Sequence, residues 1–202
     1  MDRSRLIASA LIVLLTTSCA GFRGTELPPV TAWPPSPAGA GAAGGEKPSV
    51  SVVVVGNLTF NGAQKDVPPA ALKLWTERVE SVYRSSNLFS SVERGLGETD
   101  LRAEVSITDR GEGSLVLAFL TGLTLYVIPS SATDTFVVST KFFASDGSEK
   151  GTVDKQGSST LWQQIFLLPL TPFRFPLAVG NQVFDDVHRA TLLAADTQGL
   201  LE

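Results

Sequence analysis

The 202-residue chain contains a single cysteine, Cys19, and a single histidine, His188. With one cysteine no disulfide can form within the chain, so the folded part must be stabilised by an apolar core. One histidine excludes His-rich zinc or copper sites. The sequence also lacks a nucleophile elbow, a phosphate-binding loop, the zinc motif HExxH and the dinucleotide-binding glycine motif. We therefore expect no metal and no cofactor.

Basic residues are also few. Sixteen lysines and arginines stand against 20 acidic residues, which gives a net charge of −4. This balance argues against nucleic-acid binding, because a basic face is needed to displace counterions from phosphate. It also provides no polybasic patch for an anionic membrane, so membrane attachment would require acyl chains.

The first 18 residues have the order of a secretory signal. Arg3 and Arg5 precede an apolar run over residues 6–15, and small residues lead up to Cys19. Small residues ending in Cys19, with Ala20 and Gly21 behind it, resemble the lipobox of bacterial lipoproteins, although Thr16 stands where that family usually has leucine. The resemblance implies a signal peptide over residues 1–18, cleavage before Cys19 and acylation, typically with palmitate, of that cysteine.

Two other interpretations of this segment remain open. Cys19 could be an incidental residue of an ordinary cleaved signal. The apolar run could be an uncleaved membrane helix, but it is shorter than the ~20 residues that span a bilayer. The lipid anchor is favoured, and it implies a bacterial cell envelope location. Since Ala20 rather than aspartate follows the cysteine, the resemblance implies the periplasmic face of the outer membrane.

Residues 19–48 have the composition of a tether. Prolines cluster around Trp33, and alanine and glycine alternate over residues 38–45. Few large apolar side chains are present to offset the entropy of ordering this segment, so we expect it to be unpacked and Trp33 to be idle. The folded domain is expected over residues 49–199. Hydrophobic residues make up 43% of the whole chain, which is enough for one core.

The domain is predicted to be α+β, with a mainly antiparallel sheet and helices packed on one face. Strands are expected near residues 50–55, 88–93, 101–109, 136–144 and 149–158, and helices over about 66–87 and 177–196. The continuous β-branched run at 50–55 is typical of a strand covered on both faces. We expect Val53, Val105 and Trp75 to be buried, the last on the apolar stripe of the first helix.

The sequence offers little for catalysis. A Ser-His-Asp triad would have to use His188, which we place on the surface of the last helix. Asp185 and Asp186 are adjacent on that helix and so point about 100° apart; we interpret them as solvated surface charges. We therefore expect a protein without enzymatic activity. An envelope hydrolase is the least favoured of the alternatives that we consider.

Two uncharged or nearly uncharged stretches are the informative features. Residues 115–128 carry no charge, and we expect a short helix followed by an extended segment that runs toward Pro129. Residues 161–176 mix aromatic side chains with three prolines, which bar a continuous helix. Both are too short to span a bilayer, and they are either core or an exposed surface for a membrane or a partner. The candidate contact residues of the second stretch are Trp162, Phe166, Phe173 and Phe175, because aromatic rings are favoured at both kinds of interface.

The order of elements over residues 50–196, with the segment Leu123–Pro129 and the later Trp162 and Leu167-Leu168-Pro169, resembles small bacterial envelope lipoproteins of unassigned function. That resemblance implies an α+β domain and brings no catalytic residues. We expect a non-catalytic binding or accessory subunit of an envelope assembly, attached to the membrane through Cys19 and possessing an envelope protein partner. The alternative is a lipid-handling protein that binds an acyl chain at its apolar segments.

Overall fold

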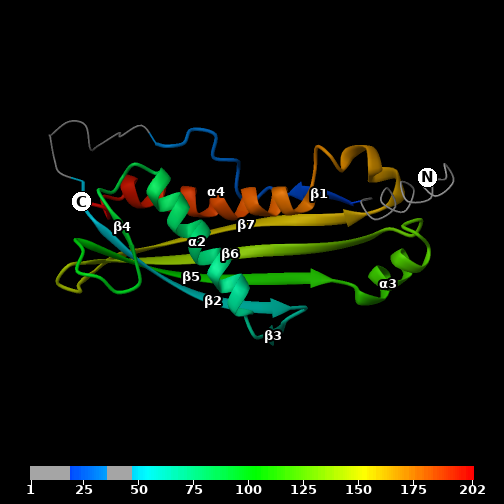
Figure 1. Ribbon diagram of the computed structural model, residues 1–202, viewed down its shortest axis with the longest axis horizontal. Helices are drawn as coiled ribbons and strands as arrows, with labels where there is room; N and C mark the ends of the chain where they lie inside the picture. Colours follow the sequence, from blue (N-terminus) through cyan, green and yellow to red (C-terminus); the bar gives the residue numbers. More distant parts are fainter. Residues whose placement is uncertain (1–18, 36–46) are drawn as a thin grey trace, which may run out of the picture.

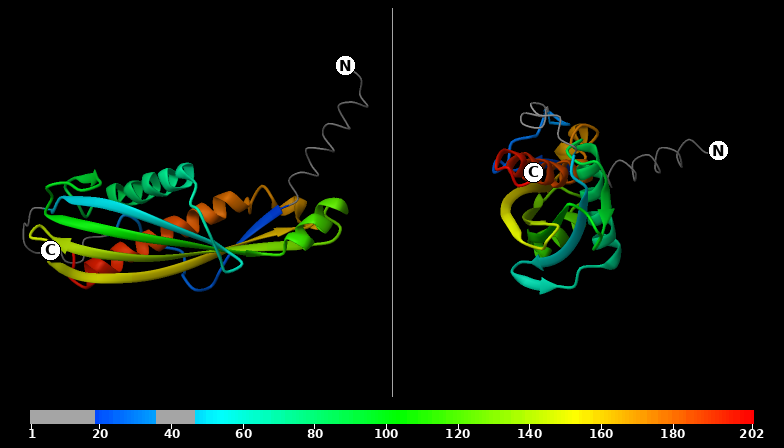
Figure 2. Two further views of the ribbon diagram at one scale, coloured as in Figure 1. Left: turned by 90° about the horizontal axis from the view of Figure 1, so that it is seen from below. Right: turned by 90° about the vertical axis from the view of Figure 1, so that its left-hand side faces the viewer.

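A computed structural model describes residues 19–35 and 47–202 and has the form of one long, twisted sheet with helices against one face (Figures 1 and 2). The expected signal peptide (1–18) and the alanine-glycine run (38–45) lie outside the described residues. Within the described part of the chain, no helix has both the length and the apolar composition needed to cross a membrane.

The elements follow one another in a strand-rich order with three α-helices among the described residues. They are β1 (Cys19–Arg23), β2 (Val50–Phe60), β3 (Ala63–Lys65), α2 (Pro69–Ser85), β4 (Val92–Arg94), β5 (Leu101–Gly113), α3 (Leu115–Leu123), β6 (Ser130–Ala144), β7 (Glu149–Gln163), the 3-10 helix η1 (Ile165–Leu170) and α4 (Pro176–Thr197).

The seven strands form one mixed sheet in the order β1-β7-β6-β5-β2-β3, with β4 paired to β2. β2 runs parallel to β5 and β4, whereas the other neighbouring strands are antiparallel. The parallel pair arises because α2 crosses over between β2 and β5, as a parallel connection requires. The predicted α+β class with helices on one face is confirmed, and α2 begins at Pro69, a residue suited to the first turn of a helix.

The core lies between the sheet and the helices α2 and α4. The alternation of β5 buries Leu101, Ala103, Val105 and Ile107 on this face. Trp75 of α2 stacks on Phe184 of α4, with 6.5 Å between the ring centroids. The predicted burial of Trp75 and Val105 is confirmed.

The second face of the sheet is not covered by helices. On this face of β2, Val53 is partly exposed and Val55 is 55% exposed. The expectation that β2 is covered on both faces, with Val53 buried, is therefore wrong. Side chains alternate between the two faces of any strand, so Val50 and Val52 point into the core, whereas Val53 and Val55 point to the uncovered face.

The tether expected over residues 19–48 is wrong for residues 19–35. Residues 19–23 form β1, which pairs with β7 along its whole length, and Ala20 is fully buried. Trp33 packs against the core; its Nε1 donates to Ser85 Oγ at 3.0 Å, and the Arg189 guanidinium lies 5.6 Å from the ring centroid. Backbone hydrogen bonds and these long-range contacts stabilise a segment whose own composition offers little apolar burial.

Candidate functional site

The exposed hydrophobic side chains gather at one end of the sheet. We call residues 115–128 and 161–177 together the apolar pole. They hold fourteen of the seventeen large hydrophobic side chains that are exposed in the described part of the chain. In Figure 1, α3 and the segment between β7 and α4 both lie at the right-hand end of the sheet, where β1 also begins. Exposed apolar side chains gathered in this way are typical of interaction surfaces.

Hydrogen bonds tie the two stretches and Cys19 together. The backbone N–H of Ile165 donates to the carbonyl of Tyr126 at 2.9 Å, which joins η1 to the turn after α3. Gln163 lies opposite Cys19 on one side and Ser130 on the other. Its amide oxygen accepts from Ser130 Oγ at 2.9 Å, and its Nε2 lies 3.9 Å from Cys19 Sγ. Cys19 therefore stands at the base of the apolar pole, and partial burial raises the pKa of its thiol.

The local structure of the first stretch agrees only partly with its prediction. α3 begins as expected, and Ser114 caps it by accepting from the Leu117 N–H at 3.2 Å. The following residues are not extended. They form a turn in which Leu125 and Tyr126 have positive φ of 52° and 66°. This turn projects Leu125 and Val127 into solvent, which an extended segment paired in the sheet would not do.

The second stretch also starts differently from its prediction. β7 continues to Gln163 rather than ending at 158, so Trp162 is a strand residue on the uncovered face. Prolines limit the rest to η1 and turns, as expected. The candidate contact residues are all exposed, to 42% for Trp162, 79% for Phe166, 84% for Phe173 and 51% for Phe175. The sequence left open whether these four side chains belong to the core or to the surface, and their exposure places them at the surface.

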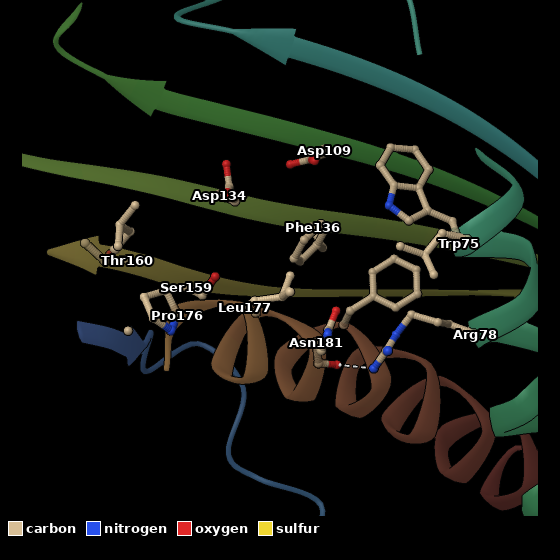
Figure 3. A pocket seen from close by; sticks show the side chains of 15 residues that line it. Trp75, Arg78, Asp109, Asp134, Phe136, Ser159, Thr160, Pro176, Leu177 and Asn181 are labelled. Atoms are coloured by element: carbon tan, nitrogen blue, oxygen red, sulfur yellow. Dashed lines mark hydrogen bonds between the residues drawn. The ribbon is translucent and has the colours of Figure 1, made fainter. Parts of the chain in front are cut away.

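A cavity of about 340 Å³ lies between α2, α4 and the sheet (Figure 3). Two carboxylates project into it from neighbouring strands, Asp109 of β5 and Asp134 of β6. Burial, and then the charge of Asp134, raise the pKa of Asp109 to about 6, and burial also raises the pKa of Asp134. Sequence reasoning did not single out either residue. The signal was present for Asp109, because it continues the inward alternation of β5 after Ile107.

Of the three polar residues singled out on the last helix, His188 and Asp186 are buried and Asp185 is half-buried. His188 is fully buried, with its ring centroid 4.7 Å from that of Phe184. Asp186 is buried and pairs with Arg23 at 2.7 Å and Arg189 at 3.1 Å. These placements correct the predictions. α4 packs against β7 and β1, which buries His188 and brings Arg23 of β1 to the Asp186 carboxylate.

Asp185 is less buried than its neighbour and pairs with Arg78 of α2 at 2.8 Å. The two aspartates therefore bind different elements, β1 and α2, as their divergence around the helix requires. Among residues 19–35 and 47–202, no three His, Cys, Asp or Glu side chains are grouped in a way that could hold a metal ion.

The fold and this end of the sheet define a single α+β domain with an apolar pole beside its first strand. No family model matches the sequence, and no curated protein matches it. Among solved structures, the chain is similar to protein XCC0632 from Xanthomonas campestris, of the family DUF330, at 14% identity over 85% of this chain and 94% of that one, with a TM-score of 0.42. It is also similar to PelC from Paraburkholderia phytofirmans, solved as a dodecamer of a point variant, at 8% identity over 82% and 97% of the two chains, with a TM-score of 0.29.

Proposed function

We propose that the protein is a lipid-anchored, non-catalytic accessory protein of the bacterial envelope, and that its apolar pole rests on the membrane that holds Cys19. The observation that carries the proposal is the position of Cys19. It is the first residue of β1 and stands beside both apolar stretches, so no spacer separates an anchor at this cysteine from the pole.

The charge distribution supports a lipid surface as the partner of the pole. The chain has 20 acidic residues, but none lies in residues 115–128 or 161–177, and Arg174 is the single charged residue there. Exposed aromatic rings beside one arginine are favoured at the level of lipid headgroups. If these apolar side chains insert into the membrane beside the acyl chains of the anchor, the apolar area that they bury increases the membrane affinity of the protein.

Surface contact is favoured over the handling of a free acyl chain. The hollow at the pole, lined by Phe22, Trp162, Gln164 and Leu167, measures about 200 Å³. Pockets that enclose a small molecule measure roughly 300–1,000 Å³. The rings of Trp162, Phe166, Phe173 and Phe175 are 42–84% exposed, so they present their apolar area outward rather than around an enclosed acyl chain.

The state of His188 supports a binding role over hydrolysis. Burial, and then the charge of Arg78, lower the pKa of the ring to about 3. A general base must reach the proton that it abstracts and works best with a pKa near the working pH. A fully buried imidazole meets neither requirement.

A spin-label experiment tests the proposal. With Cys19 acylated, a cysteine introduced elsewhere is the only free thiol of the full-length protein, so Phe173→Cys can be labelled selectively. Leu96→Cys is the matched control, because Leu96 is 79% exposed, close to the 84% of Phe173, but lies between β4 and β5, away from the pole. In phospholipid vesicles the Phe173 label should be accessible to oxygen dissolved in lipid, and the Leu96 label to a polar relaxant in water.

Equal water accessibility of both labels would contradict membrane contact. A label at position 173 that is shielded in native membranes but not in pure lipid would instead assign the pole to a membrane protein partner.

A further inference from the structure

The cavity between α2, α4 and the sheet adjoins the apolar pole. Its walls come from six elements, and aromatic rings from three of them face the same space: Trp75 of α2, Phe136 of β6 and Phe184 of α4. Figure 3 shows Asp109 and Asp134 on the sheet side of this space, with Trp75 and Phe136 beside them. Its volume of about 340 Å³ falls in the range of small-molecule sites, and its mostly apolar wall with few polar groups is typical of them.

The two carboxylates have no counter-ion in the described part of the chain. Neither Asp109 nor Asp134 takes part in an ion pair or a side-chain hydrogen bond there, and Oδ1 of Asp109 is buried without a partner. The cationic side chain in the cavity wall, Arg78, is already bound by Asp185 at 2.8 Å and by the Asn181 carbonyl at 3.1 Å. The cavity thus carries an excess of negative charge, which is costly for the half-buried Asp109 unless a cation or a proton compensates it, whereas Asp134 is exposed to solvent at the cavity edge.

We infer that this cavity binds an organic ammonium ion, with the ammonium group between Asp109 and Asp134 and its alkyl body against the rings of Trp75, Phe136 and Phe184. An ammonium group supplies both the missing positive charge and N–H donors for the unpartnered carboxylate oxygens. Aromatic faces bind the adjoining CH₂ groups and attract the cation itself. An anionic or neutral ligand would leave the carboxylates uncompensated.

The position of the cavity suggests where such a ligand comes from. Leu161, Pro176 and Leu177 line the cavity and also belong to the apolar pole. A free amine in solution and an ethanolamine lipid headgroup share the ammonium chemistry, and both could enter from this side. The inference does not depend on the proposed function, because it would hold for a domain that never touches a bilayer.

Isothermal titration calorimetry with n-octylammonium at pH 8 tests the inference, with 1-octanol as the uncharged ligand of equal chain length. We expect octylammonium to bind at least tenfold more tightly than octanol. The double variant Asp109→Asn, Asp134→Asn should reduce octylammonium affinity to that of octanol. Asp154→Asn is the matched control, because Asp154 is an exposed carboxylate on the uncovered face of β7, and it should leave the affinity unchanged.

The asparagine substitutions preserve side-chain size and remove like-charge repulsion, so folding should be retained, and the amine-to-octanol comparison needs no variant at all. Equal affinities for octylammonium and octanol would overturn the inference. So would unchanged amine binding in the double variant, or Asp109-dependent binding of Mg²⁺ without binding of the amine. A short-chain phosphatidylethanolamine that competes with octylammonium, where phosphatidylglycerol does not, would identify lipid as the source; failure to compete would identify a free amine.

Discussion

The buried His188 should make the protein sensitive to mild acid. Among the described residues neither ring nitrogen has a hydrogen-bond partner, and burial lowers the pKa of the ring to about 3. In the unfolded chain a histidine has a pKa of about 6.5. Below that pH the unfolded chain therefore binds a proton that the folded protein does not, and stability falls as the pH is lowered. At pH 5 the loss from this residue alone is about 2 kcal/mol relative to neutral pH.

Urea unfolding of the wild type and of His188→Leu, each at pH 7.5 and pH 5, measures this contribution. The raised pKa of Asp109 acts in the opposite sense, because the folded protein then binds the extra proton as pH falls through about 6, so it adds stability on acidification. Asp109 is present in both proteins, and its effect cancels when their pH dependences are compared. We expect the wild type to lose about 2 kcal/mol more than the variant between the two pH values. Parallel behaviour of the two proteins would refute the buried, neutral state of His188.

Three further predictions concern the packing and the anchor. Asp186→Asn should cost about 3 kcal/mol and Asp185→Asn about 1 kcal/mol in urea unfolding, because the side chains are 6% and 23% exposed respectively; equal costs would contradict the difference in burial. Gly56→Val should cost about 1–3 kcal/mol and alter the fluorescence of Trp75, since a Cβ at Gly56 would come within 2.9 Å of the indole ring; an unchanged spectrum would argue against this contact. Cys19→Ala should abolish acyl labelling and release the protein from the membrane fraction, and undiminished labelling would disprove the anchor.

The helices and the central strands could be predicted because their signals are local. The stripe of Leu72, Trp75, Val79 and Val82 repeats every three or four residues and places one face of α2 on the sheet. The alternation of β5 similarly fixes its inward side chains. Such patterns arise within a few residues of the chain and do not depend on distant partners.

β1 could not be predicted in this way. Its sequence, Cys-Ala-Gly-Phe-Arg, has no alternation of apolar and polar residues, and its small residues suit a flexible segment as well as a strand. It becomes a strand because β7, about 140 residues later, offers an edge, and because Gly21 permits the close approach of Pro176 and Val179 of α4. The burial of Asp186 has the same distant cause, since it depends on Arg23.

The candidate contact residues could be predicted from composition, but their arrangement could not. The three prolines indicated that residues 161–176 would not form a continuous helix, and the aromatic rings among them indicated the candidate contact residues. Nothing in the spacing showed that this stretch would meet residues 115–128 at the start of β1. That meeting follows from the start of β6 and the end of β7 lying side by side, where Ser130 and Gln163 are paired.

If Cys19 carries the proposed anchor, its position in β1 also determines which part of the chain sets the distance between the domain and a membrane. A flexible spacer of about 20 residues has a mean end-to-end distance of about 25 Å. Inserted between Cys19 and Ala20, it should allow the apolar pole to leave the bilayer, so the Phe173→Cys label should gain water accessibility. Inserted within residues 38–45, between β1 and β2, the same spacer should change nothing, because that connection lies beyond the strand that bears the proposed anchor. If the two insertions have the same effect, the attachment of Cys19 to the sheet does not hold the apolar pole against the bilayer, and this part of the proposal is wrong.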